Sequence, residues 1–395
     1  MRVNRLELTD FRNYHRATVE FPAGPTLLVG RNGMGKTNLA EAVVCLSTGG
    51  SHRVPGHQPM IRAGEETAII RSTLMGGERS IDVDVQLNRS SPNRAQVNTQ
   101  AVRFRDLPRY LKTVLFSPED LAIVRAEPTG RRRFLDDILV AATPRFTSVL
   151  ADYDKVVRQR NSLLKSARAS RIPPSELATL DVWDQRLAQL GFEIVQARRA
   201  LVTAIAPHVA TAYRNVAGDE HSTALHYEST VPEEFSAFEE LLVARRQDEL
   251  DRGTTLIGPH RDDLGLELNG LLARHYASHG ESWSFALALK LGSAELLRGE
   301  TTGDPVVILD DVFAELDARR RERLAESVIG YEQVIITAAV EDDVPSVLRA
   351  QPIRIERGTV VDVAATDSPI EKEHTAGSGQ SSVDEVTERA ESDDD

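Results

Sequence analysis

The chain has 395 residues, of which 41% are apolar and 27% are charged, an ordinary composition for a globular protein. No apolar run approaches the roughly 18 to 20 residues that a membrane-spanning helix needs, and the first residues do not read as a signal peptide. We therefore expect a cytoplasmic protein with no membrane partner. The single cysteine, Cys45, excludes an internal disulfide and any multi-cysteine metal site.

The net charge of −13 argues, at face value, against a nucleic-acid-binding protein. The charge is unevenly distributed, however, because residues 366–395 carry ten acidic and two basic side chains, a net charge of −8. Residues 125–171 carry eleven basic and five acidic side chains, a net charge of +6. The sequence thus predicts a disordered acidic tail and a basic region in the middle of the chain.

The first hundred residues are predicted to be rich in β-structure. Alternating β-prone residues predict strands at residues 3–8, 18–21 and 26–29, and a helix follows at residues 36–46, ended by two glycines. A β meander is predicted next, with strands at residues 67–74, 80–87 and 95–102.

Two long amphipathic helices are predicted in the middle of the chain. Apolar residues recur at helical spacing over residues 146–167, and over residues 180–204 they recur in alternating steps of three and four. Residues 172–174 separate the two runs, Ser175 is placed to cap the second helix, and Pro207 lies just beyond its expected end. The pattern favours an arm whose second helix is roughly 48 Å long, and a buried hairpin is the alternative.

Mixed α/β structure is predicted after the helical region. Strands are expected at residues 264–268, 306–309 and 334–337, and helices at residues 283–297 and 317–328.

Residues 30–37 read GRNGMGKT and fit the P-loop pattern G-x-x-x-x-G-K-[ST] between a predicted strand and a predicted helix. Glycines let the backbone wrap around phosphate oxygens, so that backbone N–H groups and the helix N-terminus face the anion. Lys36 can reach the β- and γ-phosphates, and the Thr37 hydroxyl can ligate Mg²⁺. The predicted site for ATP and Mg²⁺ comprises Gly30, Arg31, Asn32, Gly33, Met34, Gly35, Lys36 and Thr37.

Residues 305–311 read PVVILDD, an apolar strand that ends in two carboxylates and so has the Walker B form. We expect Asp310 to hold Mg²⁺ through its coordinated water and Asp311 to orient or deprotonate the attacking water as a catalytic residue. A buried strand with a polar exit is the alternative, and the P-loop favours the catalytic interpretation.

Residues 278–281 read SHGE at the start of the predicted apolar helix. A Ser-x-Gly sequence at a helix start can offer a hydroxyl and free N–H groups to a γ-phosphate. A simple helix cap is the alternative, for which Ser282 is equally suited.

The order of these motifs, with AELD at residues 314–317 after the two carboxylates, resembles that of the ABC-type ATPases. The resemblance implies an ATP-dependent homodimer in which Ser278 and Gly280 meet the γ-phosphate bound by the partner subunit. It also implies that Asp317 is the D-loop carboxylate near the dimer axis. Thr37 and Ser278 are 241 positions apart, longer than the insert of transporter subunits and shorter than that of long coiled-coil chromosome proteins.

More specifically, residues 1 to about 360 resemble the RecF family of bacterial recombination mediators. The segments that carry the resemblance are LTDFRNY (8–14), GRNGMGKTN (30–38), LFSPEDL (115–121), RRRFLD (131–136), GPHRDDL (258–264) and ILDDVFAELD (308–317). The resemblance implies a dimer that binds double-stranded DNA near single-strand gaps and works with RecR and RecO to help load RecA.

The expected fold class is α/β: an ABC-type P-loop ATPase head with a β-rich lobe, interrupted by a short helical arm. Residues 1–130 are expected to form the first part of the head and residues 131–250 the arm. Residues 251–365 are expected to complete the head with the signature and Walker B, and residues 366–395 to form the tail.

Two departures from the family pattern concern hydrolysis. The family usually has S-x-G-Q-Q where this chain has SHGES at residues 278–282, which leaves the role of Glu281 open. Many ABC-type ATPases place a switch histidine after the strand that follows Walker B, where this chain has Thr337-Ala338-Ala339. The loss of one polar contact to the γ-phosphate predicts a slow ATPase that acts as a switch.

Basic residues at the head–arm junction and along the first arm helix predict a DNA-binding surface. They are Arg131, Arg132, Arg133, Arg158, Arg160, Lys165 and Arg168. Two such sets in a dimer would neutralise phosphates without reading base sequence. The alternative is a solvated helix face whose cations pair with Asp152 and Asp154.

Other candidates are weaker. Residues 12–14 are expected either to approach the adenine or ribose or to form an exposed turn, and His260 and Arg261 to form a turn before a strand. Two other functions compete with the main hypothesis: the ATPase subunit of an ABC transporter, and a DNA clamp that binds ATP without hydrolysis. The insert length argues against the first, and Asp310 and Asp311 argue against the second.

Overall fold

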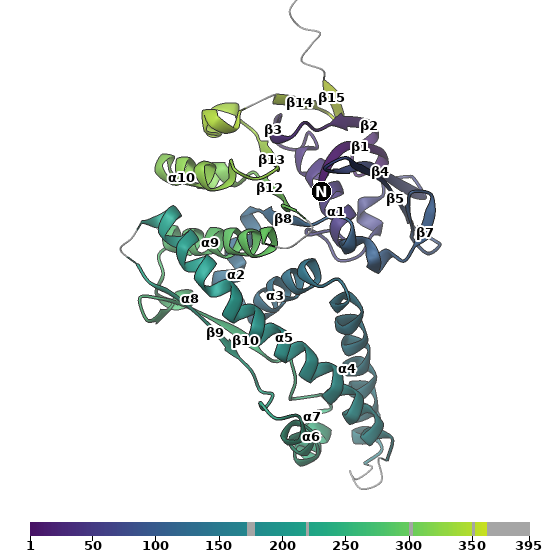
Figure 1. Ribbon diagram of the computed structural model, residues 1–395. Coiled ribbons are helices and arrows are strands. Elements are labelled where there is room, and N and C mark those ends of the chain that lie inside the picture. Colours follow the sequence, from purple (N-terminus) through teal and green to yellow (C-terminus); the bar gives the residue numbers. More distant parts are fainter. Residues whose placement is uncertain (172–177, 219–220, 300–302, 350–351, 362–395) are drawn as a thin grey trace, which may run out of the picture. The chain divides into compact units, whose positions relative to one another are not determined.

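The computed structural model describes residues 1–171, 178–218, 221–299, 303–349 and 352–361 (Figure 1). The predicted break at residues 172–174, the Ser175 cap and the acidic tail lie outside the described residues. Among the helices in these ranges, none is both long and apolar enough to span a membrane.

One six-stranded sheet is mostly parallel, with the strand order β15-β14-β3-β13-β12-β8. Its strands are β3 (Gly24–Val29), β8 (Thr113–Phe116), β12 (Val306–Asp310), β13 (Gln333–Ala338), β14 (Pro352–Glu356) and β15 (Thr359–Val361). Only β15 pairs in the antiparallel sense. Every residue of β12 and β13 is buried, as expected of a parallel sheet covered on both faces. The three strands predicted here are confirmed, whereas β8, β14 and β15 lacked a recognised signal.

A second six-stranded sheet is antiparallel, in the order β2-β1-β4-β5-β6-β7. Its strands are β1 (Arg2–Phe11), β2 (Tyr14–Glu20), β4 (Thr67–Gly76), β5 (Arg79–Asn88), β6 (Arg94–Val97) and β7 (Gln100–Val102). The prediction of one strand at residues 95–102 is wrong in one respect. Asn98 and Thr99 both have positive φ, 48° and 68°, and turn the chain into a hairpin that pairs Ala95 with Val102.

Helix α1 (Lys36–Thr48) packs between the two sheets. Leu39 and Val43 of α1 share a buried cluster with Ile308 and Ile335 of the parallel sheet and with Ile70 of the antiparallel sheet. The glycine predicted to end α1 is its C-cap, Gly49, with φ +71°.

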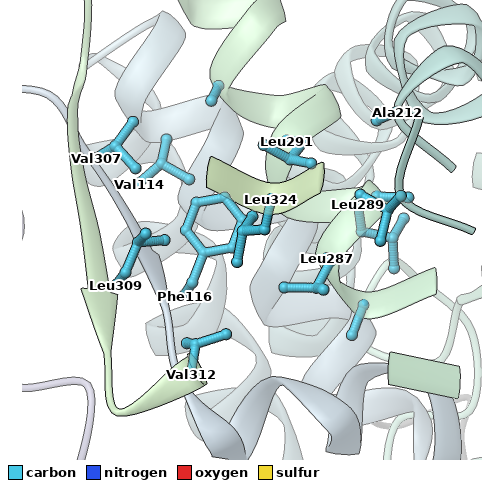
Figure 2. Close-up of a cluster of buried hydrophobic side chains, with 14 of the residues drawn as sticks. Val114, Phe116, Ala212, Leu287, Leu289, Leu291, Val307, Leu309, Val312 and Leu324 are labelled. Atoms are coloured by element: carbon cyan, nitrogen blue, oxygen red, sulfur yellow. The ribbon is translucent and has the colours of Figure 1, made fainter. Parts of the chain in front are cut away.

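The opposite face of the parallel sheet packs against helices, because alternate residues of a strand point to opposite faces. Figure 2 shows Val307 and Leu309 of β12 beside Val114 and Phe116 of β8. The helices on this side are α9 (His279–Arg298), α10 (Ala318–Val328) and α5 (Ala178–Ala217). Their side chains in the same cluster include Leu287, Leu289, Leu291, Leu324 and Ala212 (Figure 2).

The predicted helical hairpin is present as α4 (Phe146–Ala169) and α5, but α5 serves two cores. In its first half, Leu187 and Ile194 cluster with Tyr153 and Val156 of α4. In its second half, the buried residues from Leu201 to Val216 belong to the cluster of the parallel sheet and α9. The hairpin is therefore an arm in one half and part of the head core in the other. Further helices of this region are α3 (Pro128–Ala142), α6 (Phe235–Ala244) and α7 (Arg246–Arg252).

The prediction that the second long helix ends before Pro207 is wrong. Helix α5 continues to Ala217, with Pro207 exposed while Ile205 and Val209 are fully buried. The predicted apolar series ended at Ala204, but Ala204 is exposed and Ile205 is the buried residue at this point of the helix. Packing of the second half against α9 therefore outweighs the roughly 3 kcal/mol by which proline disfavours a helix interior.

A small antiparallel sheet, in the order β11-β10-β9, lies between the arm and the signature in the sequence. Its strands are β9 (Thr223–Glu228), β10 (Asp263–Leu268) and β11 (Leu271–Leu272), and the short helices nearby are α2 (Leu121–Arg125) and α8 (Ala273–Tyr276). Strand β10 confirms the prediction at residues 264–268. Helix α9 begins earlier than predicted, and Asp317 is the N-cap of α10.

Candidate nucleotide site and DNA-binding surface

The P-loop joins β3 to α1 at the carboxyl edge of the parallel sheet. Gly33 and Gly35 have φ angles of +81° and +119°, a region that favours glycine. A Cβ atom at Gly30 would lie 2.3 Å from the carbonyl oxygen of Ile355, so only glycine fits there. No side chain caps the start of α1, which leaves its first N–H groups available to an anion.

The loop between β1 and β2 braces the P-loop. The Tyr14 hydroxyl donates to the Gly35 carbonyl at 3.0 Å, and Asn13 Nδ2 donates to the Met34 carbonyl at 2.9 Å. Asn38 Nδ2, from the first turn of α1, donates to Asn13 Oδ1 at 2.7 Å. Tyr14 is buried, so it is neither part of an exposed turn nor open to a nucleotide base.

Arg12, which was predicted with residues 13 and 14 either to approach the nucleotide or to form an exposed turn, pairs with Glu41. Its guanidinium donates to both carboxylate oxygens of Glu41, at 2.7 and 2.5 Å, and to the Pro59 carbonyl at 2.8 Å. Glu41 is fully buried. Burial opposes ionisation of Glu41, but hydrogen bonds from Arg12 and Ser51 leave its pKa below the ordinary value. Arg12 thus stabilises the helix that follows the P-loop.

Asp310, at the end of β12, lies beside the P-loop. Its Oδ1 accepts hydrogen bonds from Thr37 Oγ1 at 3.0 Å and from Thr337 Oγ1 at 2.6 Å. Burial raises the pKa of Asp310 to about 6, although these two hydrogen bonds act in the opposite direction. Thr37 and Asp310 thus meet, and hydroxyl and carboxylate oxygens are ligands that suit Mg²⁺. A cation here would offset the cost of ionising a carboxylate that is only 4% exposed.

Asp311 turns the chain away from the sheet. Its φ of +52° is uncommon for a residue other than glycine, and its N–H donates to Thr337 Oγ1 at 3.0 Å. Burial raises the pKa of Asp311, and the charge of Lys36 partly offsets the effect. Lys36 Nζ, in turn, donates to Asn32 Oδ1 at 3.3 Å within the P-loop.

Thr337 is a functional residue whose role the sequence did not reveal. Its hydroxyl donates to Asp310 and accepts from the backbone of Asp311, so one side chain positions both Walker B residues. The pairing of β12 with β13 places Asp310 directly opposite Thr337. A polar residue at the end of an otherwise apolar strand was the available signal.

The signature motif begins α9 with a capping box. Ser278 Oγ accepts from the Glu281 N–H at 3.3 Å, and the Ser278 N–H donates to Glu281 Oε2 at 2.7 Å. The role of Glu281, which the sequence left open, includes capping the start of α9 together with Ser278. Ser282 is not the cap, because its hydroxyl donates to the Ser278 carbonyl at 2.8 Å.

Arg320 joins the D-loop to the signature helix. Asp317 Oδ1 caps α10 by accepting from the Arg320 N–H at 2.9 Å, and Arg320 Nε donates to Ser284 Oγ at 3.1 Å. A Cβ atom at Gly280 would lie 2.9 Å from Arg320 Nη2, so glycine makes room for this guanidinium. Within the described ranges, no hydrogen bond links these residues to the P-loop or Walker B, and Ser278 and Asp317 are exposed.

The prediction that Arg131 contacts DNA is wrong. Arg131, on α3, is 2% exposed and donates to both carboxylate oxygens of Asp263, at 2.7 and 2.8 Å. Its remaining nitrogen donates to the carbonyls of Ile123 and Ala126. A guanidinium with all its donors directed inward is unavailable to a phosphate, so Arg131 is a structural residue.

The same correction applies to Arg160 of α4, which is fully buried. Its guanidinium pairs with Asp184 at 2.7 Å and Glu249 at 2.5 Å and donates to Thr255 Oγ1 at 3.0 Å. It thereby ties α4 to α5 and α7. The signal was visible in the sequence, because Arg160 occupies a seam position between the buried Val156 and Leu164.

The remaining predicted DNA contacts are accessible. Arg133, Arg158, Lys165 and Arg168 are exposed, and Arg132 is partly buried with one nitrogen on the Asp262 carbonyl at 2.9 Å. The spacing of Arg158, Lys165 and Arg168 along α4 places them on one side of this helix.

Two sequence motifs, RRRFLD and GPHRDDL, interlock at the base of the arm. Besides the Arg131–Asp263 pair, Arg198 of α5 bridges them by donating to both oxygens of Asp136 and to the Pro259 carbonyl. Asp262 accepts from Tyr227, Ser229 and Thr230.

His260, in the second of these motifs, contributes a further contact to the joint. Its Nδ1 lies 2.7 Å from the Tyr153 hydroxyl of α4, and burial lowers its pKa to about 4. The turn predicted at residues 260–261 is thus part of a polar joint between α3, α4, α5 and β9.

The parallel sheet, the P-loop, the Walker B carboxylates and a helix that begins with Ser-x-Gly together define an ABC-type ATPase head. The fold also matches a structure described as "Crystal structure of the SmcHead bound to the C-winged helix domain of ScpA", with a TM-score of 0.54 at 16% identity over 91% of this chain and 96% of that chain. At this identity the match supports the fold alone.

Residues 2–358 match the family described as RecF/RecN/SMC N terminal domain. The chain is 55% identical over 383 residues to the DNA replication and repair protein RecF of Leifsonia xyli subsp. xyli, covering 92% of this chain and all of the relative. It is 48% identical over 371 residues to the protein of that name from Streptomyces avermitilis, covering 91% and 99%. The structure described as "Structure of the recombination mediator protein RecF-ATPrS in RecFOR pathway" matches with a TM-score of 0.83 at 28% identity, covering 91% and 97%. The chain therefore belongs to the RecF family.

Proposed function

We propose that the chain is an ATP-dependent DNA-binding protein of recombinational repair and replication restart. It dimerises on ATP, binds duplex DNA near single-strand gaps and, with RecR and RecO, helps load RecA. The observation that carries this proposal is the contact of Thr37 with Asp310 in a chain 55% identical to a protein named for DNA replication and repair. The contact assembles a P-loop with a Walker B carboxylate across 273 positions of sequence.

Each residue of the nucleotide site has a proposed role in ATP binding or hydrolysis. The backbone N–H groups of the P-loop and the start of α1 bind the phosphates of ATP, and Lys36 supplies the positive charge. Thr37 and Asp310 hold Mg²⁺, which supplies charge neutralisation to the phosphates. Asp311 orients or deprotonates the attacking water, with Thr337 fixing its backbone at 3.0 Å.

Hydrolysis is proposed to be slow. No histidine is present at residues 337–339, and the Thr337 hydroxyl is already bonded to Asp310 and Asp311. This site therefore has one contact fewer for a γ-phosphate than sites with a switch histidine. A turnover well above the order of 10 s⁻¹, a typical enzyme value, would contradict a switch-like ATPase.

The proposed dimer is supported by residues that do not contact the nucleotide site of their own chain. Ser278 and Asp317 are exposed and Gly280 is partly buried, and Arg320 joins the helices that carry these three residues. In a two-fold dimer the same surface faces its partner on both sides. Ser278 and Gly280 would then meet ATP held by the partner, and ATP would promote association.

The DNA surface is proposed to consist of Arg132, Arg133, Arg158, Lys165 and Arg168. Arg131 and Arg160 are absent from it because they are buried. The five cations lie on α3 and α4, and Arg198 of α5 donates to Asp136 of α3. Contacts of this kind neutralise phosphates and read no base sequence.

The test measures binding of duplex and gapped DNA with and without ATP, together with the oligomeric state. We expect ATP to produce a dimer and to tighten binding to both DNAs, and Lys36→Arg to retain part of the ATP binding while losing most of the turnover. If the variant loads on DNA as the wild type does, ATP is structural and the switch mechanism is wrong. A protein that stays monomeric and binds DNA equally with and without ATP would refute the proposal.

A further inference from the structure

A cavity of about 410 Å³ lies in the head beside the nucleotide site. Its walls come from the end of α1, from β8 and the residues after it, and from α3 and α9. Binding sites for small molecules typically enclose about 300 to 1,000 Å³, so the cavity is large enough for a ligand. It includes no residue of the P-loop and neither Walker B carboxylate, and it shares only Arg133 with the proposed DNA surface.

Much of the cavity wall is apolar. Leu111, Ile123 and Leu297 line it and are 2%, 7% and 1% exposed. Helix α3 adds Phe134 and Ile138, which are four positions apart and therefore share one face of the helix. Such a wall favours a ligand with a compact apolar body.

The same face of α3 brings a carboxylate into the cavity. Asp137 lines the cavity between Phe134 and Ile138. Its carboxylate Oδ2 forms an ion pair with Arg133, at 3.8 Å from Arg133 Nε. Its side chain keeps 66% of its accessible surface.

Among the other charged groups of the wall, Lys290 and Asp120 pair with each other and Arg133 donates to the Ser51 carbonyl at 3.4 Å, whereas the exposed Glu119 adds a second carboxylate. Lys290 Nζ lies 2.9 Å from Asp120 Oδ1, and the Ser117 N–H donates to the same carboxylate at 2.8 Å. The remaining hydrogen-bonding capacity of the cavity is thus mainly that of an acceptor. His52, also in the wall, adds two ring nitrogens that have no hydrogen-bond partner within the described part of the chain.

We propose that this cavity binds a small amphipathic cation, a compact apolar body that carries one protonated amine. The amine pairs with Asp137, and the body packs along Phe134 and Ile138 toward Leu111 and Leu297. A charge-assisted hydrogen bond in these surroundings is roughly twice as strong as a neutral one, so the charge of the ligand decides its affinity.

The test uses two probes that differ only at the polar end, 2-(naphthalen-2-yl)ethylamine and 2-(naphthalen-2-yl)ethanol. Calorimetric titration of the full chain at pH 7.5 should show the amine binding at least about tenfold more tightly than the alcohol. Asp137→Asn, which keeps the shape of the side chain, should reduce the amine to the affinity of the alcohol. Asp152→Asn, at an exposed position of α4, is the matched control and should leave both affinities unchanged.

A second variant tests the cavity itself. Ala122→Trp introduces a large side chain at an exposed residue of the cavity rim and should remove binding of both probes. Ala151→Trp, at an exposed position of α4, is its control, and circular dichroism melting verifies that each variant is folded. The proposal is overturned if the wild type binds neither probe, if it binds both equally, or if Asp137→Asn leaves the affinity of the amine unchanged.

Discussion

Asp310 is a buried carboxylate that two hydroxyl groups hold next to the P-loop. Burial raises its pKa from an ordinary value of 3.8 to about 6, so the ionised form is costly in the absence of a cation. Below its unfolded pKa, the side chain is neutral in both the folded and the unfolded protein, and its contribution to the free energy of unfolding is most favourable. As the pH rises through the folded pKa, the buried side chain must ionise and this contribution is lost. Neutral pH is therefore the least favourable condition for this side chain in the nucleotide-free protein.

Asp310→Asn should stabilise the nucleotide-free chain at pH 8 by about 1 to 3 kcal/mol, because asparagine carries no buried charge. The gain should shrink at pH 5, where most of the wild-type Asp310 is protonated. Urea unfolding with EDTA at both pH values measures the difference. The same variant should lose ATP hydrolysis, and equal stability of variant and wild type at pH 8 would count against the burial argument.

Arg131 and Arg133 are neighbours with opposite energetic roles. Arg131→Ala leaves Asp263 and two carbonyls without their donor and should lower the free energy of unfolding by about 3 kcal/mol. Arg133→Ala removes an exposed cation 3.8 Å from Asp137 and should change stability by at most about 0.5 kcal/mol. Urea unfolding separates the two. Equal effects would mean that the Arg131–Asp263 contact contributes little.

At the scale of elements, α5 connects two cores that are separate buried clusters. Its first half packs with α4 and α6, whereas its second half packs with α9. The buried residues continue on one face through Leu201, Ile205 and Val209, and the exposed Pro207 lies on the opposite face. A missing backbone donor at this point is compatible with the helix because packing on both sides holds it in place.

Pro207→Ala should therefore stabilise the protein by about 1 to 3 kcal/mol, since alanine restores a backbone donor and is the better helix former, while the loss of the proline ring makes the unfolded chain more flexible. Thermal and urea unfolding measure the change, with Ala206→Gly as a control at the adjacent position that should destabilise by about 1 kcal/mol. Destabilisation by Pro207→Ala would instead indicate that α5 needs a bend there to reach both cores.

For the whole molecule, the proposed dimer places the P-loop and the signature of each ATP site on different subunits. Lys36→Arg damages the first half of a site. Ser278→Asp damages the second by placing a negative charge toward the phosphate, while it keeps a good N-cap for α9. The two damaged chains should complement each other, because a mixed dimer contains one site with both wild-type halves.

An equal mixture of the two variants should recover about a quarter of the wild-type ATPase rate, since half of the dimers are mixed and each has one intact site. A mixture of Lys36→Arg with Asp310→Asn is the matched control and should stay inactive, because both changes damage the same half. If the first mixture also stays inactive, ATP sites are not shared between subunits.

The exposed cations of α4 should act through phosphate charge alone. Changing Arg158, Lys165 and Arg168 together to alanine should weaken duplex binding equally for all sequences and reduce the salt dependence by about 0.9 for each lost phosphate contact. The exposed Arg71, Arg79 and Arg94 of the antiparallel sheet provide a control with the same loss of charge. Equal loss from both triple variants would show that net charge, and not the arm, governs binding.

Much of the head was predictable because its signals are short. The P-loop spans eight consecutive residues, Walker B is one apolar strand with its carboxylates, and helical spacing identified α4, α5 and α9. These patterns also carried the family resemblance, which led to the correct family. The net charge of −13 hides the basic region at residues 125–171, so the net charge by itself does not argue against a nucleic-acid partner.

Tertiary structure alone decided what individual residues in those patterns do. Arg131 meets Asp263 across 132 positions and Arg160 meets Glu249 across 89, so the local sequence could not identify either partner. Thr337 became part of the site through the register of β13 with β12, and α5 continued past a proline because distant surfaces pack against it. The sequence by itself predicted the phosphate site and led to the family, because both depend on short spacings. Burial separated structural cations from available ones, because burial depends on the whole chain.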